Sequence, residues 1–515
     1  MAPQDRPGIV HLVGAGPGDP GLLTRRGAEV LARADVVVHD HLANPRLLDL
    51  APPGALRVRA GKWSGRCQLT QDQINATLAE HALAGRAVVR LKGGDPMVFG
   101  RGGEEAEHLR ALGIPFEIVP GVTAGVGATA YAGIPVTGRG VASAVAFVTG
   151  HQAPGLADPT SPARIDWDAL ARFPGTLVFY MGVAHLVHIA RSLMAEGKPA
   201  DTPAAVIESG ATPSQRVVEA TLGSIADRAR EAHVRPPALL VVGRVVEQRE
   251  RLTWFESRPL FGRRIVVTRP REEARRAAEG LEAMGAEVLI APTVDVLPVA
   301  DAAPLDSAID RLDGYDWVVF TSTNGVRMFL DRLFARGKDL RALGRAKLAA
   351  IGSTTAEALS RYHLRADLVP PSFRSESLAE ELAKVAAGSR ILLARADRGR
   401  TILQDELGGV ADVEQVAVYR NADAESIPAD VLARIEFGSV DWITLSSPAI
   451  ARRLHALLSP EARHRVGRDV KLATISPVTT TAARELDWDV AAEATVYTWD
   501  GLVEAMVEAV RAAGR

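Results

Sequence analysis

The chain has 515 residues, of which 47% are hydrophobic and 24% charged, with a formal net charge of −2 at pH 7. This length is too great for one hydrophobic core and predicts roughly two to four globular domains. The near-neutral charge argues against a general nucleic-acid or membrane-surface binder. A single cysteine, Cys67, excludes an intrachain disulfide. Because no apolar run reaches membrane-spanning length either, we expect a cytoplasmic protein.

The first apolar run, residues 9–13, predicts a buried strand, and the glycine-rich stretch that follows it predicts a ligand-binding turn. The alternating glycines of Gly14–Gly18 permit positive φ angles and close approach of a ligand to the backbone. Thr24 is a candidate N-cap for a helix over residues 25–34. Strand, turn and helix together predict a nucleotide-like cofactor at the carboxyl end of a parallel sheet.

A dinucleotide-binding fold is the obvious alternative for this stretch. Its fingerprint requires the helix to begin directly after the glycines, so that free N–H groups bind the pyrophosphate. Here Pro17, Asp19 and Pro20 delay the helix. Asp40, at the end of a predicted strand over residues 36–39, does lie where a ribose-binding carboxylate would. The pattern alone therefore leaves a nicotinamide enzyme open.

Strands and helices alternate from residue 9 to residue 246, which predicts an α/β domain. The loops between them are rich in glycine and proline, and three are long: RLKGGDPMVFGRGGEE (90–105), VPGVTAGVGATAYAGIPVTGR (119–139) and ESGATPSQR (208–216). Taken in order with GAGPGDPGLLT, these loops resemble the uroporphyrinogen-III C-methyltransferases of the tetrapyrrole methylase family. The resemblance covers about residues 7–255.

The resemblance implies a two-lobed α/β methyltransferase over residues 1–255, split near 135–150, which binds S-adenosylmethionine between its lobes and forms a homodimer. It implies a proton acceptor at Asp40 and a proton donor at Lys62, and it makes Arg101 and Arg139 candidates for binding substrate carboxylates. Matching the family's motifs also implies cofactor contacts at Pro17, Gly93, Gly94, Asp95, Val98, Thr123, Ala124, Met181, Gly210 and Ala238.

Two departures from the family concern substrate binding, since His41 and Gly138 replace a common arginine and a common histidine. Methyl transfer from a sulfonium needs no metal ion. We also find no cluster of His, Cys and Asp with metal-ligand spacing. The sequence therefore predicts no metal site.

After an expected linker at residues 256–263, the chain repeats itself. Three segments recur at offsets of 126, 125 and 124 residues: RIVVTRP at Arg264 as RILLARA at Arg390, DWVVFTS at Asp316 as DWITLSS at Asp441, and KLAAIGSTTAEAL at Lys347 as KLATISPVTTTAA at Lys471. The repeat predicts a duplicated two-lobed α/β domain over residues 264–515, with copies at 264–388 and 389–515.

Strands of both copies end in hydroxyl residues just before a helix. N-capping explains any one of these loops. Several helix N-termini facing one cleft would also attract carboxylates, by roughly 0.3–1 kcal/mol each at a surface. Arginines at strand ends would add bidentate contacts. The candidate substrate-binding residues of this half are Arg269, Ser322, Thr354, Arg395, Arg398, Ser446 and Thr479.

This half resembles uroporphyrinogen-III synthase. The matching elements are TSTNGV (321–326), SFRSESL (372–378), VAVYR (416–420), the ISPVTTTAA loop and the closing YTWDGLVEAM. The family implies two parallel α/β lobes joined by a two-stranded connector, with the first strands crossing between lobes. It implies closure of hydroxymethylbilane to uroporphyrinogen III with inversion of ring D. Tyr419 would hydrogen-bond the leaving hydroxyl.

Together the resemblances imply a bifunctional enzyme on the sirohaem or cobalamin route, which makes uroporphyrinogen III and methylates it twice to precorrin-2. The expected partners are small tetrapyrroles, not nucleic acids or membranes. Two alternatives stay open: a methylase acting on a later corrin intermediate, and a tetrapyrrole-binding sensory role for the C-terminal half.

Overall fold

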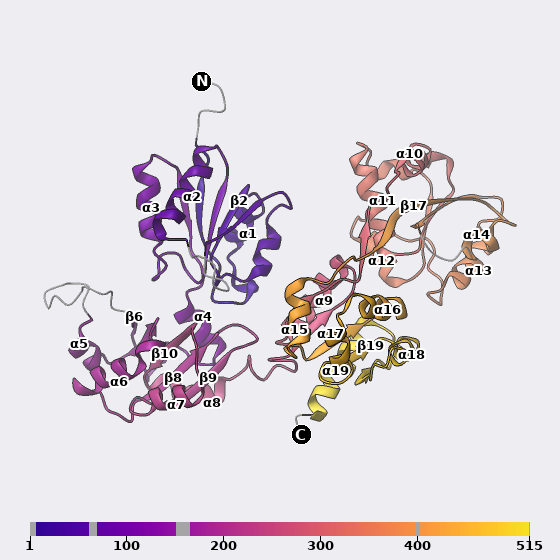
Figure 1. Cartoon of the computed structure of the whole chain (residues 1–515). Helices are drawn as coiled ribbons and strands as arrows, with labels where there is room; N and C mark the ends of the chain where they lie inside the picture. Colours follow the sequence, from indigo (N-terminus) through magenta and orange to yellow (C-terminus); the bar gives the residue numbers. More distant parts are fainter. Residues whose placement is uncertain (1–6, 61–68, 151–164, 398–401, 514–515) are drawn as a thin grey trace. The chain divides into compact units, whose positions relative to one another are not determined.

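The computed structural model describes the chain in four stretches, residues 7–60, 69–150, 165–397 and 402–513. The chain divides into two compact units (Figure 1), the first comprising Met1–Arg263 with Leu281–Glu287 and the second Arg264–Gly280 with Val288–Arg515. No helix in the described stretches is long and apolar enough to cross a membrane.

The first sheet of the first unit is parallel, with strand order β3-β2-β4-β1-β5. The predicted strand, turn and helix at its start are confirmed, and Thr24 Oγ1 accepts a hydrogen bond from Gly27 N at 3.1 Å. The helix is shorter than expected because the chain leaves it to enter β2. The elements are β1 (Val10–Gly14), α1 (Arg25–Leu31), β2 (Val36–His39), β3 (Leu56–Arg59), α2 (Gln71–Leu83), β4 (Val88–Lys92), α3 (Gly102–Ala111) and β5 (Phe116–Val119).

The second sheet of the first unit has the order β6-β7-β10-β8-β9. Strands β6 and β7 are parallel, whereas β10 runs antiparallel to both β7 and β8. The elements are α4 (Ala124–Tyr131), β6 (Val145–Thr149), α5 (Trp167–Arg172), β7 (Thr176–Tyr180), α6 (Leu186–Ala195), β8 (Pro203–Glu208), β9 (Arg216–Thr221), α7 (Ile225–Glu231), β10 (Ala238–Val242) and α8 (Arg249–Leu252).

The second unit also has two lobes, which we name by their sheets. Lobe A holds the sheet β12-β11-β18-β19-β20 and lobe B the sheet β13-β17-β16-β14-β15. The elements of lobe A are β11 (Arg264–Val267), α9 (Arg271–Ala283), β12 (Glu287–Ile290), α15 (Ala429–Glu436), β18 (Trp442–Leu445), α16 (Pro448–Leu457), α17 (Pro460–Arg465), β19 (Lys471–Thr474), α18 (Pro477–Arg484), β20 (Ala492–Glu493) and α19 (Trp499–Ala513). Those of lobe B are β13 (Val294–Leu297), α10 (Ala303–Asp310), β14 (Trp317–Phe320), α11 (Thr323–Ala335), β15 (Lys347–Ala350), α12 (Ser353–Ser360), α13 (Ser375–Val385), β16 (Arg390–Ala396), α14 (Ile402–Leu407) and β17 (Asp412–Asp423).

The two copies of the repeat exchange their first strands. Strand β11 of the first copy pairs in parallel with β18 of the second, while β16 of the second pairs with β14 of the first. An equivalent hydrogen bond stabilises each exchanged strand. In lobe A, Asp441 Oδ2 accepts from Arg264 N at 2.8 Å, and in lobe B, Asp316 Oδ2 accepts from Arg390 N at 3.0 Å. Neither lobe is therefore built from one copy alone.

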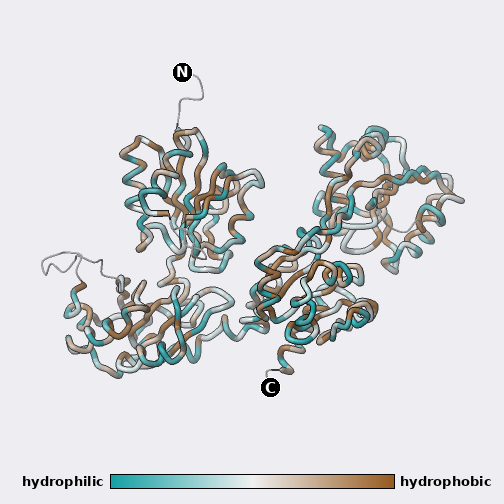
Figure 2. Tube along the Cα trace, in the orientation of Figure 1, coloured by the Kyte–Doolittle hydropathy of each residue, from teal (hydrophilic) through white to brown (hydrophobic). Residues whose placement is uncertain are grey.

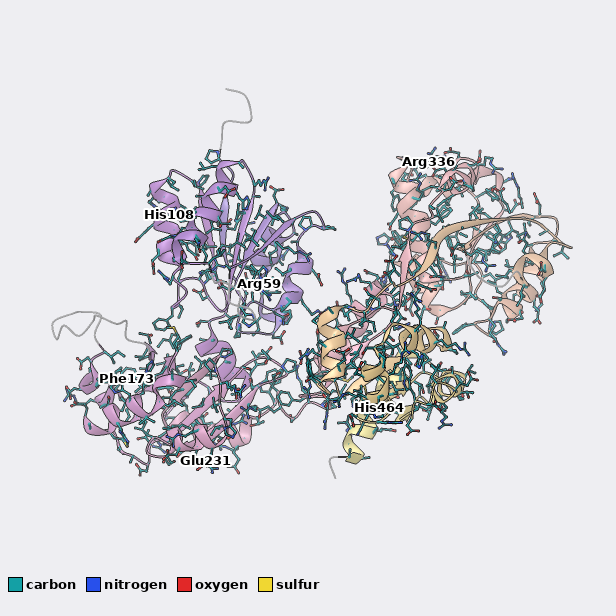
Figure 3. The ribbon with its side chains drawn as sticks, viewed as in Figure 1. Arg59, His108, Phe173, Glu231, Arg336 and His464 are labelled. Atoms are coloured by element: carbon teal, nitrogen blue, oxygen red, sulfur yellow. The ribbon has the colours of Figure 1, made fainter. Side chains whose placement is uncertain are left out.

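Hydrophobic residues follow the strands of both units, and polar residues cover the outer helices (Figure 2). Arg336, labelled in Figure 3, belongs to this polar cover and pairs with Asp310 of α10 at 2.8 Å. Residues 256–263, where a linker is expected, follow a packed aromatic segment. The ring centroid of Phe255 lies 4.7 Å from that of Tyr131, and Leu260 is fully buried.

Candidate functional site

Three glycine loops meet at the carboxyl edge of the first sheet. Gly16 N donates to Gly94 O at 3.1 Å, and Gly94 N donates to Gly16 O at 2.8 Å. A Cβ on Gly121 would lie 2.4 Å from Gly94 O, so only glycine allows this approach. Gly94 itself has a φ of +69°, and a Cβ there would meet no atom nearer than Ala124 N at 3.7 Å. A side chain there would therefore be in van der Waals contact with Ala124 at the start of α4, and the positive φ favours glycine.

Asp95 ties the second of these loops to the third. Its Oδ1 accepts from Met97 N at 2.8 Å, and its Oδ2 accepts from Gly121 N at 3.0 Å. A carboxylate has further lone pairs, so Asp95 can position the loops and still accept from a charged amino group.

Tyr180 joins the glycine loops to the second sheet, and sequence reasoning missed it. From the end of β7 its Oη accepts from Gly125 N at 2.6 Å and lies 2.6 Å from Thr123 Oγ1. Burial raises the pKa of Tyr180, so its phenol stays protonated. The start of α4, with the predicted residues Thr123 and Ala124, is thereby fixed. The available signal was the position of this tyrosine directly before Met181.

Four non-glycine residues in the loops around this edge have a strained backbone with positive φ. Phe99, Met181, Ser209 and Ala211 have φ angles of +53°, +54°, +48° and +60°. Non-glycine residues in this region are strained by about 1–3 kcal/mol each and cluster at functional sites. Phe99 packs against Tyr180 with ring centroids 4.9 Å apart and the ring planes tilted by 51°.

The other predicted cofactor residues surround the same loops. Pro17 lies against Gly127, where a Cβ would be 2.6 Å from its Cγ, and a Cβ on Gly93 would be 2.8 Å from Leu42 Cβ. Gly210 is required as a glycine because a Cβ there would lie 2.3 Å from that of Ala128. Val98 packs on the apolar cluster that contains Ala128 and Tyr180, whereas Ala238 opens β10 opposite Glu208.

A buried ionic network lies under the loops. Arg90 donates from Nη2 to Asp40 Oδ1 at 2.5 Å and from Nε to Glu105 Oε1 at 3.2 Å. Lys92 Nζ donates to the same Glu105 oxygen at 2.8 Å. Burial and the neighbouring Arg90 lower the pKa of Lys92, while Glu105 opposes the shift. The network holds Asp40 at the sheet edge, and Lys62 lies outside the described residues.

The two arginines proposed for substrate carboxylates are exposed. Arg101 begins α3 with a φ of +58° and pairs with Glu104 at 2.7 Å. Arg139 is exposed in the loop after α4. Both can reach a ligand from the surface.

In lobe B the structure brings Ser322 and Tyr419 together. Ser322 Oγ caps α11 by accepting from Gly325 N at 2.9 Å, and it lies 3.0 Å from Tyr419 Oη. Tyr419 is only 7% exposed, and burial raises its pKa. The capping interpretation is confirmed at Ser322, but capping leaves its hydroxyl in contact with a buried phenol.

A second contact chain links this pair to lobe A. Arg269 Nη2 lies 2.7 Å from Glu273 Oε2, and Asn324 Nδ2 donates to Glu273 Oε1 at 3.4 Å across the lobes. Arg269 also stacks over the Trp499 ring at 5.3 Å.

The remaining predicted residues follow strands of both lobes. Arg395 is 8% exposed on β16 and donates to Gln415 Oε1 at 3.3 Å. Thr354 is exposed, with Gly352 as the N-cap of its helix, and the cap beside Ser446 is Ser447. Thr479 is fully buried with its Oγ1 3.2 Å from Ser476 Oγ. Arg398 lies outside the described residues.

Within the described stretches, no group of three or more His, Cys, Asp and Glu side chains could hold a metal ion.

Two family models each match one half of the chain, and one relative matches most of both halves. The family model for Tetrapyrrole (Corrin/Porphyrin) Methylases matches residues 10–226, and that for Uroporphyrinogen-III synthase HemD matches residues 275–504. The chain is 38% identical over 446 residues to the Porphyrin biosynthesis protein HemD of Ruminiclostridium josui, covering 85% of this chain and 87% of the relative.

Two further similarities concern proteins named for methyl transfer. The Uroporphyrinogen-III C-methyltransferase of Bacillus subtilis (strain 168) is 43% identical over 345 residues, or 67% of this chain and 69% of the relative. The crystal structure of uroporphyrin-III C-methyl transferase from Thermus thermophilus, complexed with S-adenosyl homocysteine, is 43% identical. It covers 47% of this chain and 99% of that chain with a TM-score of 0.40.

Proposed function

Because the chain belongs to the tetrapyrrole methylases in its first half and to the uroporphyrinogen-III synthases in its second, we propose that it is a bifunctional enzyme of tetrapyrrole biosynthesis. The second unit closes hydroxymethylbilane to uroporphyrinogen III with ring D inverted. The first unit methylates that product twice with S-adenosylmethionine to give precorrin-2. The observation that carries the proposal is that one chain matches both families, and in each half the candidate residues lie at the carboxyl edge of parallel strands.

The loops of the first unit fit S-adenosylmethionine. The glycines of these loops allow a ligand to approach the backbone closely, and exposed Met181 offers apolar surface for an adenine ring. Asp95 keeps lone pairs for an ammonium group. The cofactor supplies a methyl group on a positively charged sulfur, which an electron-rich ring carbon can attack.

Asp40 is the proton acceptor of this proposal. When a ring carbon takes the methyl group from the sulfonium, the macrocycle becomes positively charged and must lose a proton from a neighbouring position, and a fixed carboxylate can accept it. Arg90 holds the Asp40 carboxylate in one place, so the proton has a defined destination. Exposed Arg101 and Arg139 bind substrate carboxylates, and Lys62 donates a proton.

The ring-closing reaction depends more on the positioning of the bilane than on a strong protein acid. The bilane loses its hydroxyl group readily, and Tyr419 can donate the hydrogen bond that helps it depart as water. Ser322 orients the Tyr419 phenol at 3.0 Å. The candidate hydroxyls and arginines of both lobes hold the carboxylates while ring D is inverted and the macrocycle closes. These residues are Arg269, Thr354, Arg395, Arg398, Ser446 and Thr479.

The alternatives are less well supported. A later corrin substrate is not favoured because the relatives carry the names of uroporphyrinogen-III enzymes and of porphyrin biosynthesis.

We further propose that the protein acts in the cytoplasm, which its single cysteine suits, and that the methyltransferase half forms a homodimer as its family does.

A two-arm reaction tests the proposal. Pure protein is given hydroxymethylbilane alone, and the released macrocycle is oxidised and its isomer identified; uroporphyrin III is expected. The second arm adds S-adenosylmethionine carrying a labelled methyl group, and a dimethylated product is expected. Uroporphyrin I in the first arm would refute the synthase role, and an unlabelled macrocycle in the second would refute the methyltransferase role.

A further inference from the structure

Two strongly exposed aromatic side chains occupy equivalent positions in the two copies of the repeat. Phe373 and Tyr497 are 124 residues apart, the same offset that relates Lys347 to Lys471. Phe373 is 60% exposed and Tyr497 is 64% exposed. The segments around them, SFRSESL and VYTWDGL, align without a gap and end at equivalent leucines.

The local backbone is the same in both places. Arg374 N donates to Ser372 O at 2.8 Å, and Thr498 N donates to Val496 O at 2.7 Å. A bond between residues two apart closes a three-residue turn, and the aromatic residue is its central member. Each lobe therefore exposes one aromatic side chain on a tight turn. The turn lies directly before α13 in lobe B and directly before α19 in lobe A.

Both turns lie at the carboxyl edges of the sheets. Ala349 of β15 bridges in parallel to Leu368, and its equivalent Ala473 of β19 bridges in parallel to Ala492. The chain thus runs alongside each edge strand and reaches the carboxyl end as it enters the turn. The Phe373 ring covers Gly352, where an added Cβ would lie 3.0 Å from Phe373 Cγ.

The candidate binding groups surround these two turns. Gly352 is the N-cap of α12, so Phe373 lies beside the helix terminus that carries exposed Thr354. Tyr497 lies two residues before Trp499, over whose ring Arg269 stacks at 5.3 Å. Each lobe thus combines an exposed ring with hydroxyl or guanidinium groups at one edge.

We propose that Phe373 and Tyr497 are a pair of ring-binding platforms, one on each lobe, that stack on pyrrole rings of the linear tetrapyrrole. This inference rests on the synthase function proposed above. The substrate has the matching chemistry, since its carboxylates suit arginine and hydroxyl groups and its pyrrole faces suit aromatic side chains. A ligand made of repeated rings also suits two equivalent platforms in a repeated protein.

The test compares Phe373→Ala and Tyr497→Ala with a matched control, Phe437→Ala. Phe437 is 80% exposed in the same unit, but it lies between α15 and the start of β18, at the amino end of that strand. Two readouts are used in the full-length protein: the KM for hydroxymethylbilane, and the Kd of uroporphyrin III, a stable probe, from its fluorescence. Phe373→Tyr and Tyr497→Phe test whether any aromatic ring suffices.

We expect each alanine variant to raise the KM and the Kd by about tenfold, whereas the aromatic exchanges and Phe437→Ala stay within about twofold of the original. Thermal melting should be unchanged because all three side chains are exposed. If the alanine variants match Phe437→Ala in both readouts, the platforms are refuted while the synthase function stands. If the unaltered protein makes no uroporphyrinogen III, the synthase function itself fails.

Discussion

Arg90 donates to Asp40 Oδ1 at 2.5 Å while its own side chain is only 2% exposed, so a buried cation holds the proposed proton acceptor. The other side of Arg90 is held by Glu105, which is fully buried and also bonds Lys92. Removing one partner from such a network leaves an uncompensated charge, which costs about 3–5 kcal/mol. The position of Asp40 therefore depends on a buried ionic network beneath it.

Glu105→Gln should destabilise the first sheet and slow methylation together. The two buried cations, Arg90 and Lys92, would lose their shared anion, so we expect a loss of about 3–5 kcal/mol in the free energy of unfolding. Hydrogen exchange of the β4 amides measures this loss within the first unit. The rate of methyl transfer to uroporphyrinogen III should fall with it, because Asp40 loses its fixed partner.

Glu104→Gln is the matched control for this change. Glu104 is the neighbouring residue, but its side chain is 55% exposed. It forms an ion pair with exposed Arg101 at 2.7 Å. Exposed pairs contribute about 0–1 kcal/mol, so β4 exchange should scarcely change. Equal effects of the two variants on β4 exchange would show that the buried network does not support this sheet.

Features set by neighbours in the sequence could be predicted. Thr24 is an N-cap and Gly16 adopts a positive φ, because capping and glycine turns depend on a few adjacent residues. The exchange of first strands between β11 and β16 followed from the family resemblance, and the repeat alone did not show it.

Contacts between distant segments could not be predicted. Tyr180 is 57 residues from Thr123, and Arg90 is 50 residues from Asp40, so only the folded sheets bring them together. One signal was available. Arg90 and Lys92 are two apart on a strand and therefore share a face, which pointed to a common buried partner.

Tyr180→Phe should weaken cofactor binding without unfolding the protein. The change removes the oxygen that accepts from Gly125 N and contacts Thr123 Oγ1, leaving a buried N–H without its partner. Such a loss costs about 1–3 kcal/mol, and we expect the Kd of S-adenosylhomocysteine to rise by about tenfold or more. Isothermal titration calorimetry measures it. An unchanged Kd would mean that the start of α4 does not contact the cofactor.

Two partly buried histidines should make both units lose stability in mild acid. Burial lowers the pKa of His39 in the first unit and of His455 in the second below their ordinary 6.5. Stability from a group with a lowered pKa is complete above the unfolded value and is lost as the pH falls through the folded value. Scanning calorimetry between about pH 7 and pH 5 should show this loss. His39→Gln should reduce the pH dependence of the first unit's melting transition only. His455→Gln should reduce that of the second unit's transition only.

Tyr419→Phe should slow ring closure while leaving the fold intact, with Tyr315→Phe as its control. The phenol of Tyr315 also bonds a partner, Glu414 Oε2 at 2.6 Å, but it precedes β14 at the amino end of the strand. Losing one hydrogen bond to the leaving group should lower kcat by about five- to tenfold for Tyr419→Phe, and Tyr315→Phe should leave kcat unchanged. Because burial raises the pKa of Tyr419, the unaltered enzyme should keep its donor, and a flat pH profile, up to about pH 10. A loss of kcat in Tyr315→Phe equal to that in Tyr419→Phe would assign the effect to stability and not to the leaving hydroxyl.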